Sequence, residues 1–387
     1  MVTKTLYNKV MNYGLIEVVS KGINWITLPL LALVTTAVLY GEVAYYYLII
    51  VLTGTFFAFG QNRVILSSQD NEVEIKKNIS ILISFFLVAV VEALVYFLGY
   101  LELKLFFAIL CGCFFAIQNN ISLAFRAQNR INDFALLKTY YVVRIITIFL
   151  VVYFTRSIEW YLFFELLILI VYFLAFSKFK FIKNDFNVIT SLKDGLILVM
   201  YAISMYLITN IDKFYIEHLF SKEVLASYYF LFSLSTSFTF ISAYFSIRYE
   251  RDIYNSPNYT VARLRAGEFA KKTILFSILI FPFIFLFYYF YVGFTSLDYK
   301  PYWFIMVFIA QLIYFVSIKE TYVLTYLKKN KIIFYCSFFV LFFSVILNYF
   351  LIKFIGVLGS ILTLIFCYTV FWLVMAFFNS RYLSLNK

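Results

Sequence analysis

The chain contains twelve apolar runs, each long enough to cross a lipid bilayer as a helix. A span needs roughly 17–25 apolar residues, because the hydrocarbon core is about 30 Å thick. With 64% apolar residues in a chain of 387, no polar layer remains to cover twelve such helices, so lipid must be their solvent. The expected spans are 13–38, 41–60, 78–98, 104–125, 138–154, 158–176, 194–211, 224–247, 273–294, 301–318, 331–351 and 354–378. The sequence therefore predicts an all-α polytopic membrane protein.

A short motif occurs in both halves of the chain. The expected second span opens Gly41-Glu-Val-Ala-Tyr-Tyr-Tyr-Leu48, and the eighth opens Lys222-Glu-Val-Leu-Ala-Ser-Tyr-Tyr-Phe230, about 181 residues later. Six spans is an even number, so the halves have the same orientation, as in transporters built from parallel repeats. We expect an N-terminal six-helix lobe at 1–180, a cytoplasmic linker at 181–193 and a C-terminal six-helix lobe at 194–387.

The basic residues predict the orientation. Of the 32 Lys and Arg residues, 24 fall in alternate loops and their flanks, and six fall in the loops between. Cytoplasmic loops carry the excess of Lys and Arg, so both termini are expected in the cytoplasm. The net charge of +12 is therefore explained by topology, and no nucleic-acid partner is expected. The longest expected outer loop, 212–223, is too short for an extracellular domain.

The sequence contains no motif of an enzyme or a cofactor site. P-loop, HExxH, GxSxG and paired CxxC motifs are all missing. Four cysteines lie inside apolar spans and are expected to be packing residues: Cys111, Cys113, Cys336 and Cys367. We therefore expect no catalytic residue, no metal site and no cofactor.

Cations and amides are predicted in the inner half of the membrane. Counted by helical rise, Lys21 lies roughly 12 Å and Arg144 roughly 9 Å from the inner face. Gln118, Asn119 and Asn120 reach about the same level, so these five are candidate substrate-binding residues. Snorkelling of the cations to the interface and interhelical hydrogen bonding of the amides are the structural alternatives. In the second half no charge is expected at mid-membrane, where Gln311 is the deepest polar residue.

Three carboxylates are candidates for ion coupling. Glu17 precedes Lys21 by four residues, so the two can pair on one helix face. Glu92 and Glu165 both come out about 10 Å from the outer face by helical rise. Each is either buried in the protonated form or part of a proton relay, and the sequence leaves both alternatives open.

Three segments resemble the polysaccharide (O-antigen) flippase family of the multidrug/oligosaccharidyl-lipid/polysaccharide exporter superfamily. The first is Asn24-Trp-Ile-Thr-Leu-Pro-Leu-Leu31, running into Tyr40-Gly-Glu-Val43. The second is Asn210-Ile-Asp-Lys-Phe-Tyr-Ile216, followed by the Tyr228-Tyr229 helix start. The third is Leu327-Lys-Lys-Asn-Lys331, followed by Asn348-Tyr-Phe-Leu351 and Gly356-Val-Leu-Gly-Ser360. The resemblance covers most of the chain, but its motifs are degenerate and identify no substrate.

The resemblance implies two six-helix lobes around a central cavity that opens alternately inward and outward. It implies a multi-pass protein of the bacterial inner membrane that moves an undecaprenyl-pyrophosphate-linked oligosaccharide, an O-antigen or capsule repeat unit, to the outer leaflet. Lys21 and Arg144 would then bind the pyrophosphate, since such a head group cannot cross hydrocarbon unaided. Expected partners are the lipid-linked oligosaccharide, membrane lipids, a polysaccharide polymerase and a chain-length regulator.

Two other functions remain open. A cation-coupled exporter of small molecules from the same superfamily would need carboxylates in its cavity, and Glu92 and Glu165 favour it. An O-antigen polymerase has a similar length, but needs a large outer loop that the sequence does not provide.

Overall fold

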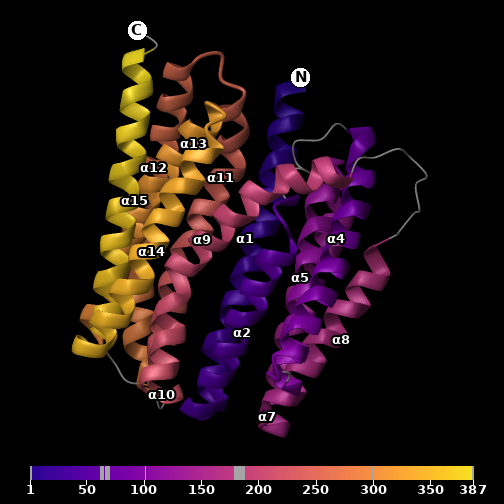
Figure 1. Cartoon of the computed structure of the whole chain (residues 1–387), viewed down its shortest axis with the longest axis vertical. Coiled ribbons are helices and arrows are strands. Elements are labelled where there is room, and N and C mark those ends of the chain that lie inside the picture. The colour runs from indigo at the N-terminus through magenta and orange to yellow at the C-terminus, as the bar shows by residue number, and fades with distance from the viewer. Residues whose placement is uncertain are drawn as a thin grey trace. The chain divides into compact units, whose positions relative to one another are not determined.

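The computed structural model describes residues 2–61, 65, 70–100, 102–177, 188–295, 297 and 300–385. Within these ranges the chain is all-helical (Figure 1). The helices are α1 (Val2–Val34), α2 (Ala37–Phe57), α4 (Asp70–Phe97), α5 (Leu103–Ala127), α6 (Ile131–Lys138), α7 (Tyr140–Thr155), α8 (Ile158–Phe176), α9 (Val188–Leu219), α10 (Lys222–Thr236), α11 (Phe238–Tyr254), α12 (Tyr259–Val292), α13 (Pro301–Tyr326), α14 (Asn330–Ile355) and α15 (Val357–Leu385).

Every expected span overlaps one of these helices. Eleven stretches of the described residues are long and apolar enough to cross a membrane, two of which combine α6 with α7 and α10 with α11. The remaining expected span, 13–38, lies mostly in α1, which contains Glu17 and Lys21 and is not among the eleven. The prediction of an all-α polytopic membrane protein is confirmed.

Large apolar side chains cover the outer surface of many helices. Phe97, Phe283 and Phe354 are 83%, 73% and 75% exposed. In water such a surface would be strongly unfavourable, whereas lipid tails solvate it. Backbone amides and carbonyls have no partner in hydrocarbon, and the helix satisfies them internally.

Polar N-cap residues mark the starts of α8, α10 and α12. The Ser157 and Ser221 hydroxyls accept hydrogen bonds from the backbone N–H of Trp160 and Val224, at 3.5 and 3.4 Å. Asn258 caps α12 in the same way, at 3.0 Å from the Val261 nitrogen. Each cap satisfies a backbone donor that the first helical turn leaves unpaired.

The helices group into two compact units. Unit 1 contains residues 1–41 and 204–387, and unit 2 contains residues 42–203. The division passes through α2 and α9, each of which has residues in both units. The expected lobe boundary at 181–193 stays a prediction, and residues 178–187 lie outside the described part of the chain.

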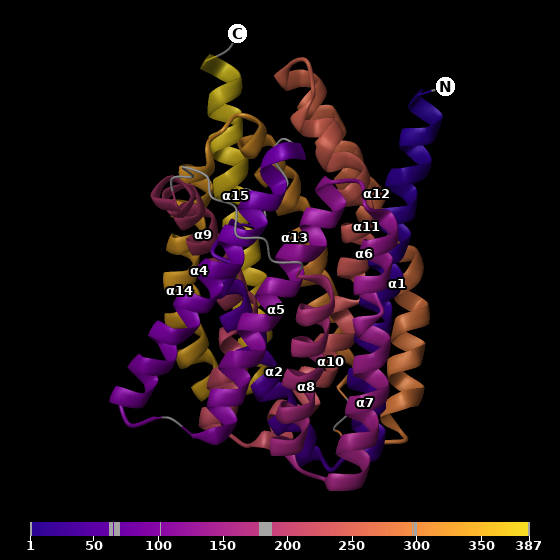
Figure 2. The same ribbon diagram turned by 90° about the vertical axis from the view of Figure 1, so that its right-hand side faces the viewer.

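In unit 1, α15 packs along both α13 and α14, and α12 connects α13 to α11 (Figures 1 and 2). The first helix also belongs here, since α1 packs against α11 and α10. One core cluster of unit 1 joins α11, α12 and α13 through Phe245, Ile253, Phe269 and Val323.

In unit 2, α5 lies between α4 and α8, and α7 packs on α8 (Figure 2). Small residues let α5 approach its neighbours closely. A side chain added at Gly112 would lie 2.0 Å from the Thr53 hydroxyl and 3.0 Å from the backbone nitrogen of Gly54. Small residues at helix contacts are typical of membrane bundles. The position requires glycine because α2 occupies the space of a Cβ.

The orientation yields a prediction that reporter fusions can test. A fusion at Ser157, between α7 and α8, should report the outer side, and one at Asn255, after α11, should report the cytoplasm. The physical reason is the excess of Lys and Arg in the loops on the Asn255 side. Paired phosphatase and fluorescent-protein fusions measure both positions, and the reverse pattern would contradict the orientation.

Candidate functional site

Arg144 of α7 and Glu165 of α8 form a buried ion pair in unit 2. The Arg144 Nε donates to both carboxylate oxygens of Glu165, at 2.7 and 2.8 Å. The two residues are 4% and 2% exposed. Removing one partner from such a pair costs about 3–5 kcal/mol, because the other charge stays buried without compensation. The pair therefore holds α7 and α8 in one relative position.

Three tyrosines complete the surroundings of this pair. The Tyr140 hydroxyl donates to Glu165 Oε1 at 2.6 Å. The Tyr161 hydroxyl accepts a long hydrogen bond of 3.5 Å from Arg144 Nη2. The ring of Tyr47, on α2, lies with its centroid 5.2 Å from the Arg144 Cζ. Hydrogen bonds and an aromatic face replace the water that a charge pair loses on burial.

The separate membrane levels that helical rise predicts for Arg144 and Glu165 are wrong, because the two side chains are in contact. The error lies in the boundary of the fifth span. The expected span begins at 138, whereas the apolar stretch begins at Ile131 and includes α6. Arg144 therefore lies thirteen residues after its start, roughly 20 Å along the helix.

The amides of α5 have different surroundings. Gln118 and Asn120 are buried, and Asn119 is partly exposed. Asn120 is 0% exposed, and neither its Nδ2 nor its Oδ1 has a hydrogen-bond partner among the described residues. A buried amide without partners is costly, about 1–3 kcal/mol for each unpaired group. Of the three candidate amides of α5, Asn120 is thus the one whose side chain is fully buried with its hydrogen-bonding capacity unmet among the described residues.

Glu92 of α4 has no cation partner among the described residues. Both of its carboxylate oxygens are buried without a hydrogen bond. It follows Ser84 and Val88 on the buried side of α4, the side that packs against α5. An ionised carboxylate in this position is costly, so a bound proton or cation would stabilise it.

Lys21 lies in unit 1 and pairs with Glu17 one turn earlier on α1, with Lys21 Nζ 3.4 Å from Glu17 Oε1. The side chain of Lys21 is 40% exposed and that of Glu17 is 19% exposed. An exposed pair of this kind contributes about 0–1 kcal/mol. Lys21 is therefore available to a ligand at much lower cost than Arg144.

A second buried ion pair, Asp212 with Lys213, was missed by the sequence reasoning. Both residues were expected in an outer loop at 212–223, but α9 continues to Leu219 and α10 begins at Lys222. Asp212 is 2% and Lys213 is 0% exposed. The expectation that these two residues lie in an outer loop is wrong, whereas the expectation of no charge at mid-membrane in the second half stays a prediction. Ser221 is an N-cap signal for the start of α10, and it is the end of α9 at Leu219 in the structure that leaves a two-residue connection before that helix.

Glu320 of α13 is a further buried carboxylate in unit 1, at 4% exposed. It accepts a hydrogen bond from Asn379 Nδ2 at 2.6 Å, and Lys319 Nζ lies 2.9 Å from its other oxygen. The described residues contain no group of three or more His, Cys, Asp or Glu that could hold a metal ion.

The repeated helix start has the same role in both units. Tyr47 and Tyr228 are 181 residues apart, at matching positions of the two motifs. Tyr47 covers Arg144, and the Tyr228 ring centroid lies 5.4 Å from Lys213 Nζ. The motif therefore places a tyrosine beside a buried cation in each half.

No protein-family model matches the sequence, and no curated protein matches it. Solved structures do. An outward-facing multidrug resistance MATE family transporter of the MOP superfamily matches with a TM-score of 0.69 over 96% of each chain, at 11% identity. The chain has the MATE fold. An inward-facing structure of such a transporter matches with a TM-score of 0.65 over 98% of this chain and 94% of the other, at 12% identity.

A MATE structure in complex with MaL6 gives a TM-score of 0.66, covering 97% of this chain and 96% of the other. The two-lobed helical architecture expected from the sequence is thus confirmed. MATE transporters lie in the superfamily named by the sequence resemblance, whereas its polysaccharide branch is not represented among these structures.

The Arg144–Glu165 pair predicts the effect of three variants on stability. Arg144→Met should lower the free energy of unfolding by about 3–5 kcal/mol, because Glu165 stays buried without its cation. Arg144→Met combined with Glu165→Leu should recover most of this loss, since the buried charge is gone. Thermal unfolding of the purified protein in detergent measures both effects.

Lys21→Ala is the matched control and should change stability by about 0–1 kcal/mol, because its pair is partly exposed. Equal destabilisation by the single and double variants would show that the pair does not hold α7 against α8.

Proposed function

We propose that this protein is a secondary transporter that exports a small molecule by alternating access, coupled to the movement of a cation. The observation that carries the proposal is the MATE fold, shared over 96% of the chain with a multidrug resistance transporter. The division into two compact helical units agrees with a mechanism in which rigid units move against one another.

Glu92 is the proposed coupling residue. Of the three carboxylates considered from the sequence, Glu17 is paired with Lys21 and Glu165 with Arg144. Glu92 has buried oxygens and no partner among the described residues. Because a proton or cation bound there would remove an uncompensated charge, binding and release at Glu92 can be tied to a gradient.

This proposal predicts a separation between driven and exchange transport. In proteoliposomes with an imposed pH or Na⁺ gradient, the wild type should move a fluorescent cationic dye such as ethidium, whereas Glu92→Gln should lose at least tenfold of this activity. Dye exchange without a gradient should persist in Glu92→Gln, because it needs no coupling ion. Glu102→Gln, at an exposed carboxylate before α5, is the control.

Equal gradient-driven activity in Glu92→Gln and the wild type would remove Glu92 from the mechanism. Wild-type protein that moves no dye under either gradient would contradict small-molecule export.

A second candidate is the translocation of an undecaprenyl-pyrophosphate-linked oligosaccharide in the bacterial inner membrane, with both termini in the cytoplasm. The observation that favours it is Lys21, a cation on α1 whose side chain is 40% exposed and whose ion-pair partner among the described residues is Glu17 of the same helix. In this candidate Lys21 binds the pyrophosphate, with Arg144 and the amides Gln118, Asn119 and Asn120 as further ligands, and Glu17 is the resting partner of Lys21.

Deletion of the gene separates the two candidates. If the protein is the flippase, deletion should abolish surface polysaccharide while the lipid-linked unit still forms inside. Lys21→Ala should then insert normally and fail to restore surface polysaccharide, and Lys21→Arg should restore part of it, because a second cation still meets the phosphate oxygens. Normal surface polysaccharide in a deletion strain without another flippase would exclude this candidate.

A further inference from the structure

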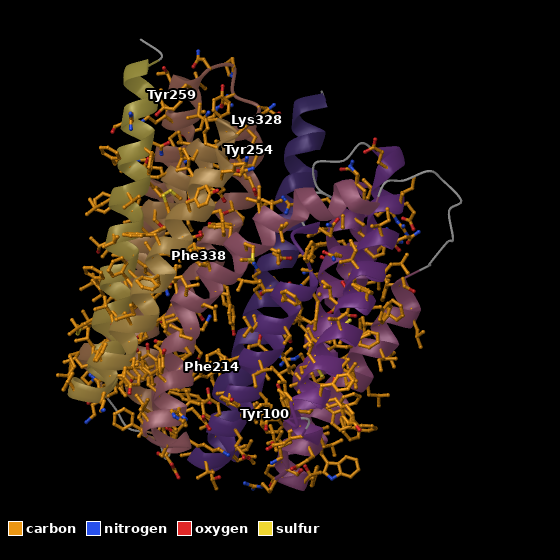
Figure 3. All side chains as sticks on the ribbon, in the orientation of Figure 1. Tyr100, Phe214, Tyr254, Tyr259, Lys328 and Phe338 are labelled. Atoms are coloured by element: carbon orange, nitrogen blue, oxygen red, sulfur yellow. The ribbon has the colours of Figure 1, made fainter. Side chains whose placement is uncertain are left out.

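Asp212 and Lys213 of α9 form a polar site inside unit 1. In this unit Phe214, the next residue, lies toward the end opposite to Tyr254, Tyr259 and Lys328 (Figure 3). Adjacent residues on a helix normally point in different directions. Here the Lys213 side chain turns back, so that its Nζ lies 3.1 Å from Asp212 Oδ1 and 2.9 Å from the Thr209 carbonyl oxygen.

Aromatic rings of α10 also contact the Lys213 ammonium. The ring centroid of Phe232, on α10, lies 3.4 Å from Lys213 Nζ, and that of Tyr228 lies 5.4 Å away. Three kinds of group surround the ammonium: a carboxylate, a backbone carbonyl and an aromatic face. Each attracts a monovalent cation electrostatically, through negative charge or partial negative charge. The ammonium is therefore bound as a free cation would be.

The Asp212 carboxylate is fixed by groups other than the ammonium. Its Oδ1 accepts the backbone N–H of Lys213 at 2.8 Å. Its Oδ2 accepts the Tyr228 hydroxyl and, at 2.8 Å, the Ser360 hydroxyl of α15. Ser360 Oγ also lies 2.7 Å from the Tyr228 hydroxyl oxygen, so the single Ser360 proton is shared between that oxygen and Asp212 Oδ2. The anion would thus keep its position if the Lys213 side chain were removed.

We propose that these groups form a binding site for a monovalent cation, and that the chain's own Lys213 ammonium occupies it. With Asp212 ionised, the site is neutral only when it holds a cation, because Asp212 is buried and its hydrogen bonds leave the negative charge uncompensated. Ammonium and K⁺ are close in size, so a chain without the lysine side chain would take K⁺ or Na⁺ from solution. This part of unit 1 accordingly needs no external ion, and the inference is independent of which substrate the protein transports.

Cation-dependent stability tests the proposal in the purified full-length protein. Lys213→Ala opens the site, so its unfolding temperature in detergent should rise by several degrees, saturably, when KCl or NaCl replaces N-methyl-D-glucamine chloride at equal ionic strength. The wild type should show no such rise, because the ammonium already fills the site.

Three control variants distinguish a site from a general salt effect. Lys213→Met should give no saturable rise, because its side chain occupies the space of the cation. Asp212→Asn combined with Lys213→Ala should give none, because the anion is gone. Lys353→Ala removes an exposed lysine that also faces a tyrosine ring, with its Nζ 6.0 Å from the Tyr349 centroid, and should likewise give none.

Lys213→Ala that folds but shows no K⁺- or Na⁺-dependent rise would overturn the proposal, as would an equal rise in the Asp212→Asn double variant. Failure of Lys213→Ala to accumulate in membranes would also overturn it, because the K⁺ of the cell would have filled the site.

Discussion

A bilayer offers no water to satisfy a polar group, and the rest of this structure depends on that constraint. Backbone groups meet it by forming helices, which is why the described part of the chain is helical. Side-chain charges meet it by pairing. Arg144 with Glu165, and Lys213 with Asp212, are each buried and bonded to one another, with tyrosine hydroxyls as additional donors. The Arg144–Glu165 pair joins α7 to α8, and the hydrogen bonds of Asp212 join α9 to α10 and α15.

The same constraint separates residues that hold the fold from residues that can change state. A fully bonded pair such as Arg144–Glu165 has little to gain from a ligand, because its charges are already compensated. Glu92 and Asn120 differ, since their buried polar atoms have no partner among the described residues. Such groups raise the energy of this state and are relieved by a proton, an ion or a polar substrate. In the proposed mechanism the unsatisfied groups are therefore the candidates for binding and release, and the paired groups hold the helices in place.

Much of the fold could be predicted from the sequence, because a bilayer translates apolar length directly into helices. Eleven of the twelve expected runs coincide with apolar helical stretches of the described residues, and the short connections between them also followed from this rule. The ends of the helices could not be predicted from apolar length, because polar residues at the end of a span look like loop residues in the sequence. Asp212 and Lys213 were assigned to a loop for that reason, although Ser221 already indicates where α10 begins.

The contacts between helices were harder to predict than the helices. Nothing in the apolar pattern of α1 shows that it packs against α11 and α10. Arg144 and Glu165 were both identified as candidates, but an error of seven residues at Ile131 placed them at different depths. Their pairing depends on which faces of α7 and α8 pack against each other. The sequence of either helix alone does not specify that packing.

The central claim, that two rigid helical units move against one another, is tested most directly by electron paramagnetic resonance distances between spin labels in lipid nanodiscs. The labels would be placed at exposed positions after replacement of the four buried cysteines: Asn132 in unit 2, and Asn255 and Lys331 in unit 1. The account predicts one unchanging distance for Asn255–Lys331. For Asn132–Asn255 it predicts two distances whose populations shift with pH or added substrate. A single Asn132–Asn255 distance that no condition changes would contradict it.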